Sequence, residues 1–173
     1  MSGLVPIAVF IDLYDPKTNG IEERFQNADP VNTISFDDGP FGNGDYKYLS
    51  FLYSGATQTK SGDNLEATLL LANTSTLRDG STAPNKLSMN YAHEAVDKGW
   101  SVYVHLCKMN TAFTTVEDVL STDSWTVTSM GYDATNIELM LSTGVDAVGG
   151  NNGRFLTSSL VGHLPITGNI IAK

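Results

Sequence analysis

The side chains of this chain that could carry out chemistry are few and widely separated. The three histidines are His93, His105 and His163, and none lies in an H-E-x-x-H motif or beside a G-x-S-x-G turn. Glu94 directly follows His93, so these two side chains would point to different sides of a helix. A nucleophile and a base can still come together from distant segments. We therefore predict that the chain is not an enzyme, and an unrecognised hydrolase is the remaining catalytic alternative.

Residues 15–26 are the stretch most similar to a calcium-binding loop. Asp15, Asn19 and Gly20 occupy the first, fifth and sixth positions of such a loop. Lys17 stands where an oxygen ligand is required, and the last position holds glutamine in place of the bidentate glutamate. A β-hairpin turn is therefore the preferred interpretation, and we predict no metal and no cofactor.

The cysteine and the glycine-rich stretch indicate no redox or phosphate site. Cys107 is alone, which excludes a disulfide or a cysteine-based metal site within one chain, and its apolar neighbours predict a buried, inert thiol. Residues 144–153 are rich in glycine but match no phosphate-binding motif, so we expect a flexible connection there. Asp37 and Asp38 precede a glycine, which is typical of a solvated turn. A calcium site completed by other residues is the alternative.

Composition favours one acidic, soluble domain. The 173 residues are 41% hydrophobic, which is enough for one core, and we expect a single domain over residues 1–173. The net charge of -9 opposes nucleic-acid binding, which needs clustered lysine and arginine. The amino terminus lacks the basic start of a signal peptide, and no apolar run approaches the roughly 20 residues that span a bilayer. We expect synthesis in the cytoplasm and no membrane insertion.

Turn residues and hydrophobic periodicity divide the chain into strands and one helix. Residues 7–14 and 21–26 flank a Pro- and Asn-Gly-containing turn, which predicts a β-hairpin. Apolar positions at helical spacing, with Pro84 near the first turn and Gly99 just past the last, predict a helix over 84–98. We expect a loop at 37–45, further strands over 31–36, 46–53, 65–73 and 100–109, and a second hairpin from 125–130 and 136–141.

These elements predict a mainly β fold, with an antiparallel sandwich or barrel-like sheets and one α-helix at about 84–98. In residues 46–53 apolar and aromatic residues occur at both odd and even positions, which indicates a strand covered on both faces. The alternation in 65–73 fits sheet-on-sheet packing. We expect residues 144–173 to form a flexible C-terminal arm without regular structure.

The order of the segments is itself informative. An opening strand at 10–14 precedes an aromatic strand that ends in small residues at 46–55, and then a stretch at 61–73 that ends in Leu71-Ala72-Asn73. The helix, the strand at 100–106, the hairpin over 125–141, and the pairs Arg154-Phe155 and Leu164-Pro165 follow. This series resembles the minor tail protein L family of long-tailed bacteriophages, and 61–73 is similar to that family's G-x-x-P-x-L-x-V-x-N signature.

The resemblance implies a structural component of a phage tail hub or baseplate. Such a subunit would form a ring, a trimer or hexamer, by homo-oligomerisation, and would link the tail tube to distal hub or fibre proteins. Its expected location is the virion tail. Family members closest to the lambda protein carry a cysteine-rich C-terminal part that holds an iron–sulfur cluster. Because this chain has only Cys107, we expect no such cluster here.

A ring subunit buries sheet edges and extended loops against its neighbours, so we expect its interface residues in loops. The expected ranges are 37–45, 60–64, 144–154 and 164–173. The candidate interface residues are Asp37, Asp38, Phe41, Asp45, Lys60, Asn64, Arg154, Leu164, Pro165 and Ile170.

A β-sandwich module that binds host-surface glycans is the alternative function. Phe41, Tyr46 and Tyr48 lie near the glycine-rich loop at 37–45 and could stack on a sugar ring. Core packing would explain the same aromatic residues. A specific sugar ligand for a stable monomer would favour the glycan-binding function over the assembly function.

Overall fold

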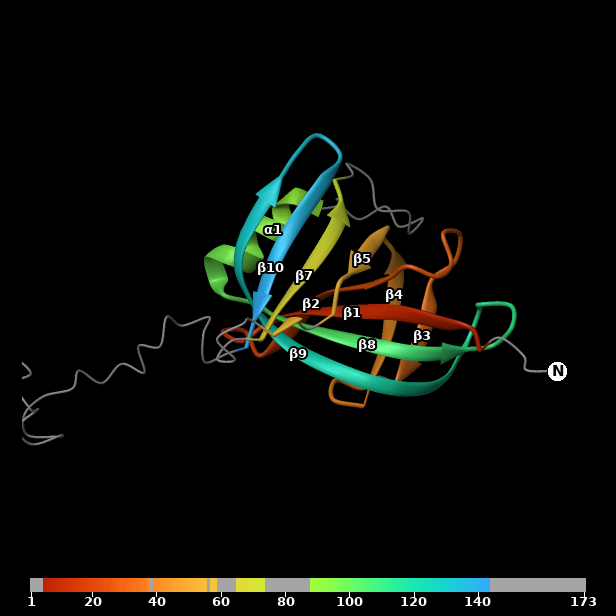
Figure 1. Cartoon of the computed structure of the whole chain (residues 1–173). Coiled ribbons are helices and arrows are strands. Elements are labelled where there is room, and N and C mark those ends of the chain that lie inside the picture. Colours follow the sequence, from red (N-terminus) through yellow and green to blue (C-terminus); the bar gives the residue numbers. More distant parts are fainter. Residues whose placement is uncertain (1–4, 38, 56, 59–64, 74–87, 144–173) are drawn as a thin grey trace, which may run out of the picture.

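The structure is a computed structural model that describes residues 5–37, 39–55, 57–58, 65–73 and 88–143 (Figure 1). These residues form one large mixed sheet with a single helix, α1 (Ser88–Lys98), so the predicted mainly β fold is confirmed. The strands are β1 (Ile7–Asp15), β2 (Gly20–Gln26), β3 (Ile34–Asp37), β4 (Asn43–Tyr48), β5 (Phe51–Tyr53), β6 (Thr57–Gln58), β7 (Leu65–Ala72), β8 (Ser101–Met109), β9 (Val116–Tyr132) and β10 (Asn136–Ser142). The expected C-terminal arm at 144–173 lies outside the described residues.

β1 and β2 form the predicted hairpin. They pair antiparallel along their length, with a bulge between Leu13 and Tyr14. Asn19 adopts a positive φ of 54°, a left-handed conformation that asparagine tolerates better than most residues. Oδ1 of Asp15 accepts a hydrogen bond from the N–H of Lys17 at 2.8 Å. Asp15 and Asn19 thus act in the turn between the two strands.

The strands of the sheet follow the order β3-β4-β2-β1-β8-β9-β10-β7-β5, and β6 also pairs with β7. Neighbouring strands are antiparallel except for β2 and β4, which makes the sheet mixed. β9 belongs to both halves of the sheet, because its residues 116–126 pair with β8 and its residues 126–132 pair with β10. In Figure 1 the strands β7 and β10 run across the direction of β1 and β8.

Residues 46–53 do not form the single strand that their composition predicts. They divide between β4, which pairs with β2 and β3, and β5, which pairs with β7. Two backbone hydrogen bonds hold the residues between β4 and β5 to both sides: Leu49 N–H donates to Gln26 O of β2 at 3.0 Å, and Ala72 N–H of β7 donates to Ser50 O at 2.8 Å. This segment therefore links the two ends of the main sheet and gives the sheet a curled, barrel-like form.

The main hydrophobic core lies between the two halves of the curled sheet. Inward side chains of β1 and β8 face those of β7 and β10, and α1 packs against β1, β9 and β10. One sheet folded over itself thus provides the expected face-to-face packing. The buried residues of this core include Ile11, Leu13, Phe25, Leu69, Leu71, Ala92, Ala95, Trp100, Val102, Trp125, Ile137 and Leu139.

A second core lies on the opposite face of β1 and β8, beneath the β3–β4 hairpin. The ring of Phe36 lies 4.8 Å from that of Phe10 and 4.7 Å from that of Tyr46, measured between centroids. Cys107 and Met109 of β8 complete this layer. Because β1 and β8 are covered on both faces, apolar side chains occur at both odd and even positions of these two strands.

Two local predictions are wrong in their boundaries. The expected loop at 37–45 is shorter, because β3 continues to Asp37 and β4 begins at Asn43. Glycine and aspartate are rare in strands, but the hairpin pairing outweighs that preference. β9 begins at Val116, well before the predicted start at 125. Residues 116–124 are mostly exposed and polar, so they lack the alternation that marks a half-buried strand.

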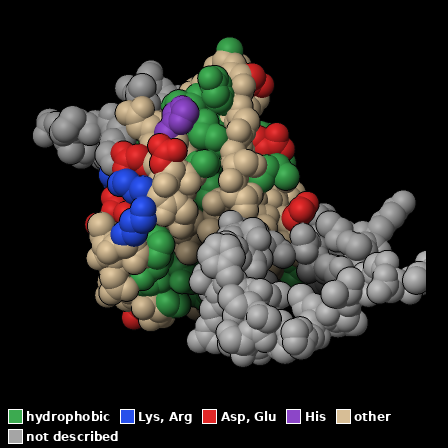
Figure 2. All heavy atoms as spheres, turned by 90° about the vertical axis from the view of Figure 1, so that its left-hand side faces the viewer, with side chains coloured by type: hydrophobic (Ala, Val, Ile, Leu, Met, Phe, Trp, Pro, Cys, Tyr) green, Lys and Arg blue, Asp and Glu red, His purple; other side chains and the backbone are tan. Residues whose placement is uncertain are grey.

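The predicted helix is confirmed over Ser88–Lys98, and residues 84–87 lie outside the described residues. Gly99 ends the helix with a positive φ of 63°, as expected of a C-terminal cap. Nζ of Lys98 lies 2.9 Å from Oε2 of Glu94 one turn earlier. Figure 2 shows the side of the molecule on which α1 lies, where basic side chains are next to acidic ones.

Candidate functional site

The β3–β4 hairpin carries the three candidate interface residues that the structure describes. Asp37 ends β3, Phe41 lies in the turn and Asp45 lies in β4. Both aspartates are exposed and Phe41 is partly buried, so the structure brings them together on one surface hairpin. The other candidates lie outside the described residues: Asp38, Lys60, Asn64, Arg154, Leu164, Pro165 and Ile170.

Phe41 packs on two tyrosines of the strands beneath it. Its ring stacks on Tyr14 of β1 at a centroid distance of 5.2 Å and meets Tyr103 of β8 edge to face at 4.8 Å. All three side chains are partly buried. Of the other aromatics expected near this loop, Tyr46 is fully buried and Tyr48 is partly buried. The half-exposed cluster of Tyr14, Phe41 and Tyr103 is the aromatic surface of this hairpin.

A polar cluster lies in the same layer and takes one side chain from each of β1, β2, β8 and β9; its β1 and β8 members are buried, and its β9 member, Thr122, is exposed. Oδ1 of Asp12 lies 3.4 Å from Nε of Arg24, and Oδ2 of Asp12 lies 3.3 Å from Nε2 of His105. Nδ1 of His105 lies 2.9 Å from Oγ1 of Thr122. Asp12 and His105 are 0% exposed. One carboxylate therefore meets both a guanidinium and an imidazole inside the fold.

The order of hydroxyl, imidazole and carboxylate in this cluster is also that of a serine-hydrolase triad. Here, however, the imidazole and the carboxylate have no exposed surface, and the ring of Phe36 lies 6.2 Å from that of His105. A buried charge is costly unless it is paired, and a paired one fixes the relative position of its strands. We therefore interpret the cluster as structural: it holds β1, β2, β8 and β9 in register.

Sequence analysis did not find this cluster, although a signal was present. Asp12 lies between apolar residues of a predicted strand, and so does His105. A polar residue in a buried strand requires a partner. The partner could not be inferred, because it depends on the antiparallel register of β1 and β8, in which His105 lies opposite Phe10.

Gly44→Ala is expected to break the contact between Arg24 and Asp12. The guanidinium of Arg24 lies directly against Gly44, so a methyl group there would occupy the guanidinium's position. Displacing Arg24 also removes the hydrogen bond from its Nη1 to Asn43 O at 3.1 Å. We expect the free energy of unfolding, measured by urea denaturation, to fall by about 1–3 kcal/mol. Gly131→Ala, where the added methyl has no neighbour within 4 Å, is the control, and equal losses in the two variants would contradict the prediction.

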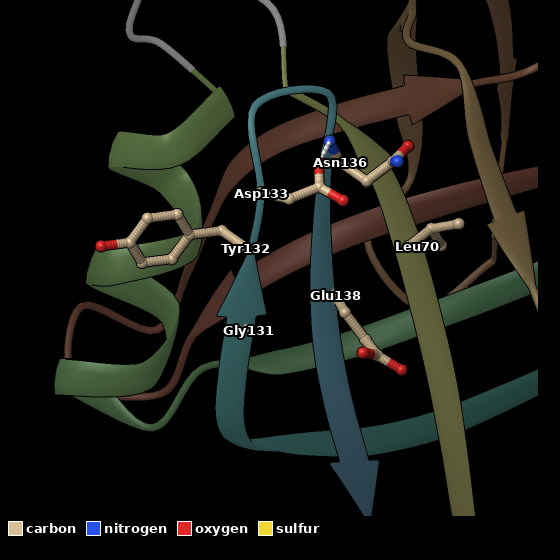
Figure 3. A pocket seen from close by; sticks show the side chains of 6 residues that line it. All are labelled: Leu70, Gly131, Tyr132, Asp133, Asn136 and Glu138. Carbon is tan, nitrogen blue, oxygen red and sulfur yellow. Dashed lines mark hydrogen bonds between the residues drawn. The ribbon is translucent and has the colours of Figure 1, made fainter.

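The β9–β10 hairpin bears a shallow surface pocket of about 240 Å³ (Figure 3). Asp133 organises the turn beside it, because its Oδ1 accepts hydrogen bonds from the N–H groups of Thr135 and Asn136 at 2.7 Å each. These hydrogen bonds, the one from Thr135 first, lower the pKa of Asp133. Figure 3 shows Tyr132 pointing toward α1 and away from Leu70. The lining side chains do not converge, so the pocket is a surface hollow beside a well-ordered turn.

A second pocket, of about 280 Å³, is lined by the end of β5 and by residues of β1, β8 and β9. Val9, Val104 and Leu106 supply its apolar residues. At its rim the hydroxyl of Tyr53 donates a hydrogen bond to Oδ2 of Asp123 at 3.0 Å. Burial and then this hydrogen bond raise the pKa of Tyr53 above its usual value, so the tyrosine stays neutral and connects β5 to β9.

Large apolar side chains are exposed at several places among the described residues; Val5, Val31, Leu65 and Tyr132 are exposed outside the two groups defined next. On β5, Leu52 is 65% exposed and lies opposite the half-buried Leu70 of β7; we call these two residues the β5–β7 group. At the far end of β1, β8 and β9, Ile7 is 48% exposed, Leu120 is 48% exposed and Phe113 is 39% exposed; we call these three the β1–β9 group. Contiguous exposed apolar patches are typical of contact surfaces, whereas single exposed apolar side chains are common on any protein.

Cys107 is expected to stay unreactive in the folded protein. Its side chain is 0% exposed, and burial followed by the negative charge of Asp118 raises its pKa to about 12. The thiolate is the reactive form, so almost none is present at about pH 8. An aromatic disulfide reagent should therefore react rapidly only after the protein is unfolded in urea. Rapid reaction without denaturant would contradict the burial of this thiol.

Within the part of the chain that the structure describes, no group of three or more His, Cys, Asp or Glu side chains is placed to hold a metal ion. Among the described residues, no helix has the length and apolar character needed to cross a membrane. No protein-family model matches the chain, and a search of curated proteins finds no match.

Proposed function

We propose that this chain is a non-enzymatic structural subunit of a bacteriophage tail hub or baseplate. In this role it forms a ring by homo-oligomerisation and links the tail tube to distal hub or fibre proteins in the virion. The proposal starts from the order of sequence segments that resembles the minor tail protein L family. The strands β1 and β7, the helix α1, the strand β8 and the hairpin of β9 and β10 follow one another in that order.

One observation carries the assembly role: the two exposed apolar groups lie on different strands. A subunit of a closed ring contacts its two neighbours through two different surfaces, because the interface is heterologous. In this proposal the exposed Leu52 with the half-buried Leu70 supplies one such surface, and the exposed Ile7, Phe113 and Leu120 supply the other. A two-fold dimer would need only one self-complementary surface. The pair of surfaces therefore favours a head-to-tail assembly, of which a closed ring is one form.

Analytical ultracentrifugation and native mass spectrometry of the purified chain test the assembly role. We expect one closed oligomer, a trimer or a hexamer, that grows in population with concentration. Leu52→Lys should weaken it because a charge would be buried at the interface, whereas Val31→Lys, at a site 78% exposed outside both groups, should not. A monomer at every concentration would contradict the proposal. Antibody labelling of the encoding virus in the electron microscope would then test the location in the tail.

Glycan binding remains a second candidate because of the half-exposed cluster of Tyr14, Phe41 and Tyr103. Aromatic faces at a surface can stack on the apolar face of a sugar ring. A glycan array with the wild-type chain and with Phe41→Ala separates the two functions. A specific sugar that binds a stable monomer, and is lost in Phe41→Ala, would favour the glycan function over assembly.

A further inference from the structure

Among the described strands, the first part of β9 has a partner on one side only. Residues 116–126 pair with β8, whereas β10 pairs with β9 only from Thr126 to Tyr132. Among the described residues, no strand pairs with the other side of residues 116–124. Figure 1 shows β9 along the lower margin of the sheet, with β8 above it. The described part of the chain therefore presents a strand edge there.

An open strand edge is a template for another strand, because its outward N–H and C=O groups have no ladder partner. Natural edges are often protected by charged side chains, by proline or by β-bulges, and residues 116–124 contain acidic residues but no lysine or proline. Two register shifts opposite β8 bend the strand at Glu117 and Leu120. From Ser121 to Ser124 the pairing with β8 is regular, so this part of the edge is straight enough to accept a strand.

The side chains beside the edge define what could bind there. Leu120 on the edge and Ile7 near it are each 48% exposed. Glu117, Asp118 and Asp123 make the same stretch acidic. A fitting strand therefore needs apolar side chains, a positive charge and no acidic residue of its own.

Residues 154–164 of this chain have that composition. Arg154 is their only charged residue apart from His163, and the apolar residues are Phe155, Leu156, Leu160, Val161 and Leu164. The glycine-rich residues 144–153 precede them, and such a stretch spans at most about 35 Å when extended. The chain leaves β10 at Ser142, opposite Thr126, next to the open part of β9. Length, charge and point of departure all suit delivery of this segment to a β9 edge.

We propose that residues 154–164 of one copy add as a strand to residues 116–124 of the neighbouring copy. This inference rests on the proposed ring assembly. A segment that leaves one copy and binds a different surface of the next makes a head-to-tail contact, which is the kind that closes a ring. Backbone hydrogen bonds supply the attachment, and Arg154 at one end of the added strand meets the acidic residues of the edge.

Disulfide cross-linking between two variants of the full chain tests the pairing. Leu120 and Ser159 lie at the midpoints of the two segments, so they meet whichever way the added strand runs. We expect a mixture of Leu120→Cys and Ser159→Cys chains to form a disulfide-linked heterodimer under mild oxidation. The native Cys107 is buried and does not compete. Leu120→Cys mixed with Lys17→Cys, on the β1–β2 turn, is the control and should not cross-link.

Charge reversal gives an independent readout. Arg154→Asp should weaken assembly about tenfold in the ultracentrifuge, because it places an acid against an acidic edge. Lys17→Asp changes the net charge equally and should have little effect. Two outcomes would overturn the inference while the ring itself stands. One is that a Leu120→Cys and Ser159→Cys double variant forms a disulfide only within single chains. The other is that the two charge reversals have equal effects. A wild-type chain that stays monomeric would overturn both the inference and the proposed function.

Discussion

Replacing Asp12 with alanine is expected to lower the free energy of unfolding by about 3–5 kcal/mol, the cost typical of breaking a buried charge pair. The side chain of Asp12 is 0% exposed and lies 3.4 Å from Arg24 and 3.3 Å from His105. Without the carboxylate, a guanidinium that is only 13% exposed loses this counter-charge in the middle of the sheet. Urea denaturation followed by tryptophan fluorescence measures the loss.

Asp12→Asn separates the charge from the shape of this residue. The amide keeps the size of the side chain and can still hydrogen-bond, but it does not neutralise Arg24. We expect a destabilisation close to that of Asp12→Ala. Asp37→Asn, at an exposed position of β3, is the matched control and should change stability by less than about 0.5 kcal/mol. If Asp12→Asn proved as stable as the wild type, the role of charge in this cluster would be wrong.

Trp100→Ala should have an effect of similar size through a different cause. Trp100 is 0% exposed and stands between the end of α1 and the start of β8, within the main core. Its backbone N–H donates to Ala95 O at 2.9 Å, and its backbone O accepts from Val127 N–H at 3.0 Å. Removing the indole leaves a large cavity at this junction, for which we expect a loss of about 3–5 kcal/mol in the free energy of unfolding.

The control for Trp100→Ala is an aromatic residue on the surface. Tyr132 at the end of β9 is 66% exposed, so Tyr132→Ala should cost less than about 0.5 kcal/mol. Thermal unfolding followed by circular dichroism compares the two variants. Similar melting temperatures would contradict the position of Trp100 in the core. Because both aromatic residues lie outside the proposed interfaces, neither variant tests assembly.

The placement of the candidate interface residues in the fold was predictable only where they are close together in sequence. Asp37, Phe41 and Asp45 do lie together on the β3–β4 hairpin, as their closeness in sequence suggests. The open edge of β9 was missed, because residues 116–124 are polar and exposed and show no strand periodicity. What makes them a strand is the pairing with β8, and no local pattern contains that information.

The sequence by itself determined the elements whose cause is local. The turn after Asp15, the helical spacing before Gly99 and the alternation after Leu65 each favour one conformation within a few residues, and all three are found in the structure. These signals act through turn geometry, capping and amphipathic period, which depend on neighbours along the chain. A mainly β fold with one helix followed from them.

Only the tertiary structure decided how the elements meet. The bridge through residues 46–53, the second core beneath Phe36 and the meeting of Asp12 with His105 all join segments that are distant in sequence. Their free energy comes from burial and pairing that exist only once the sheet has curled and its register is fixed. The edge of β9 also became visible only in the folded chain. An edge is a strand side on which no other strand pairs, and the pairing of the described strands is known only from the structure.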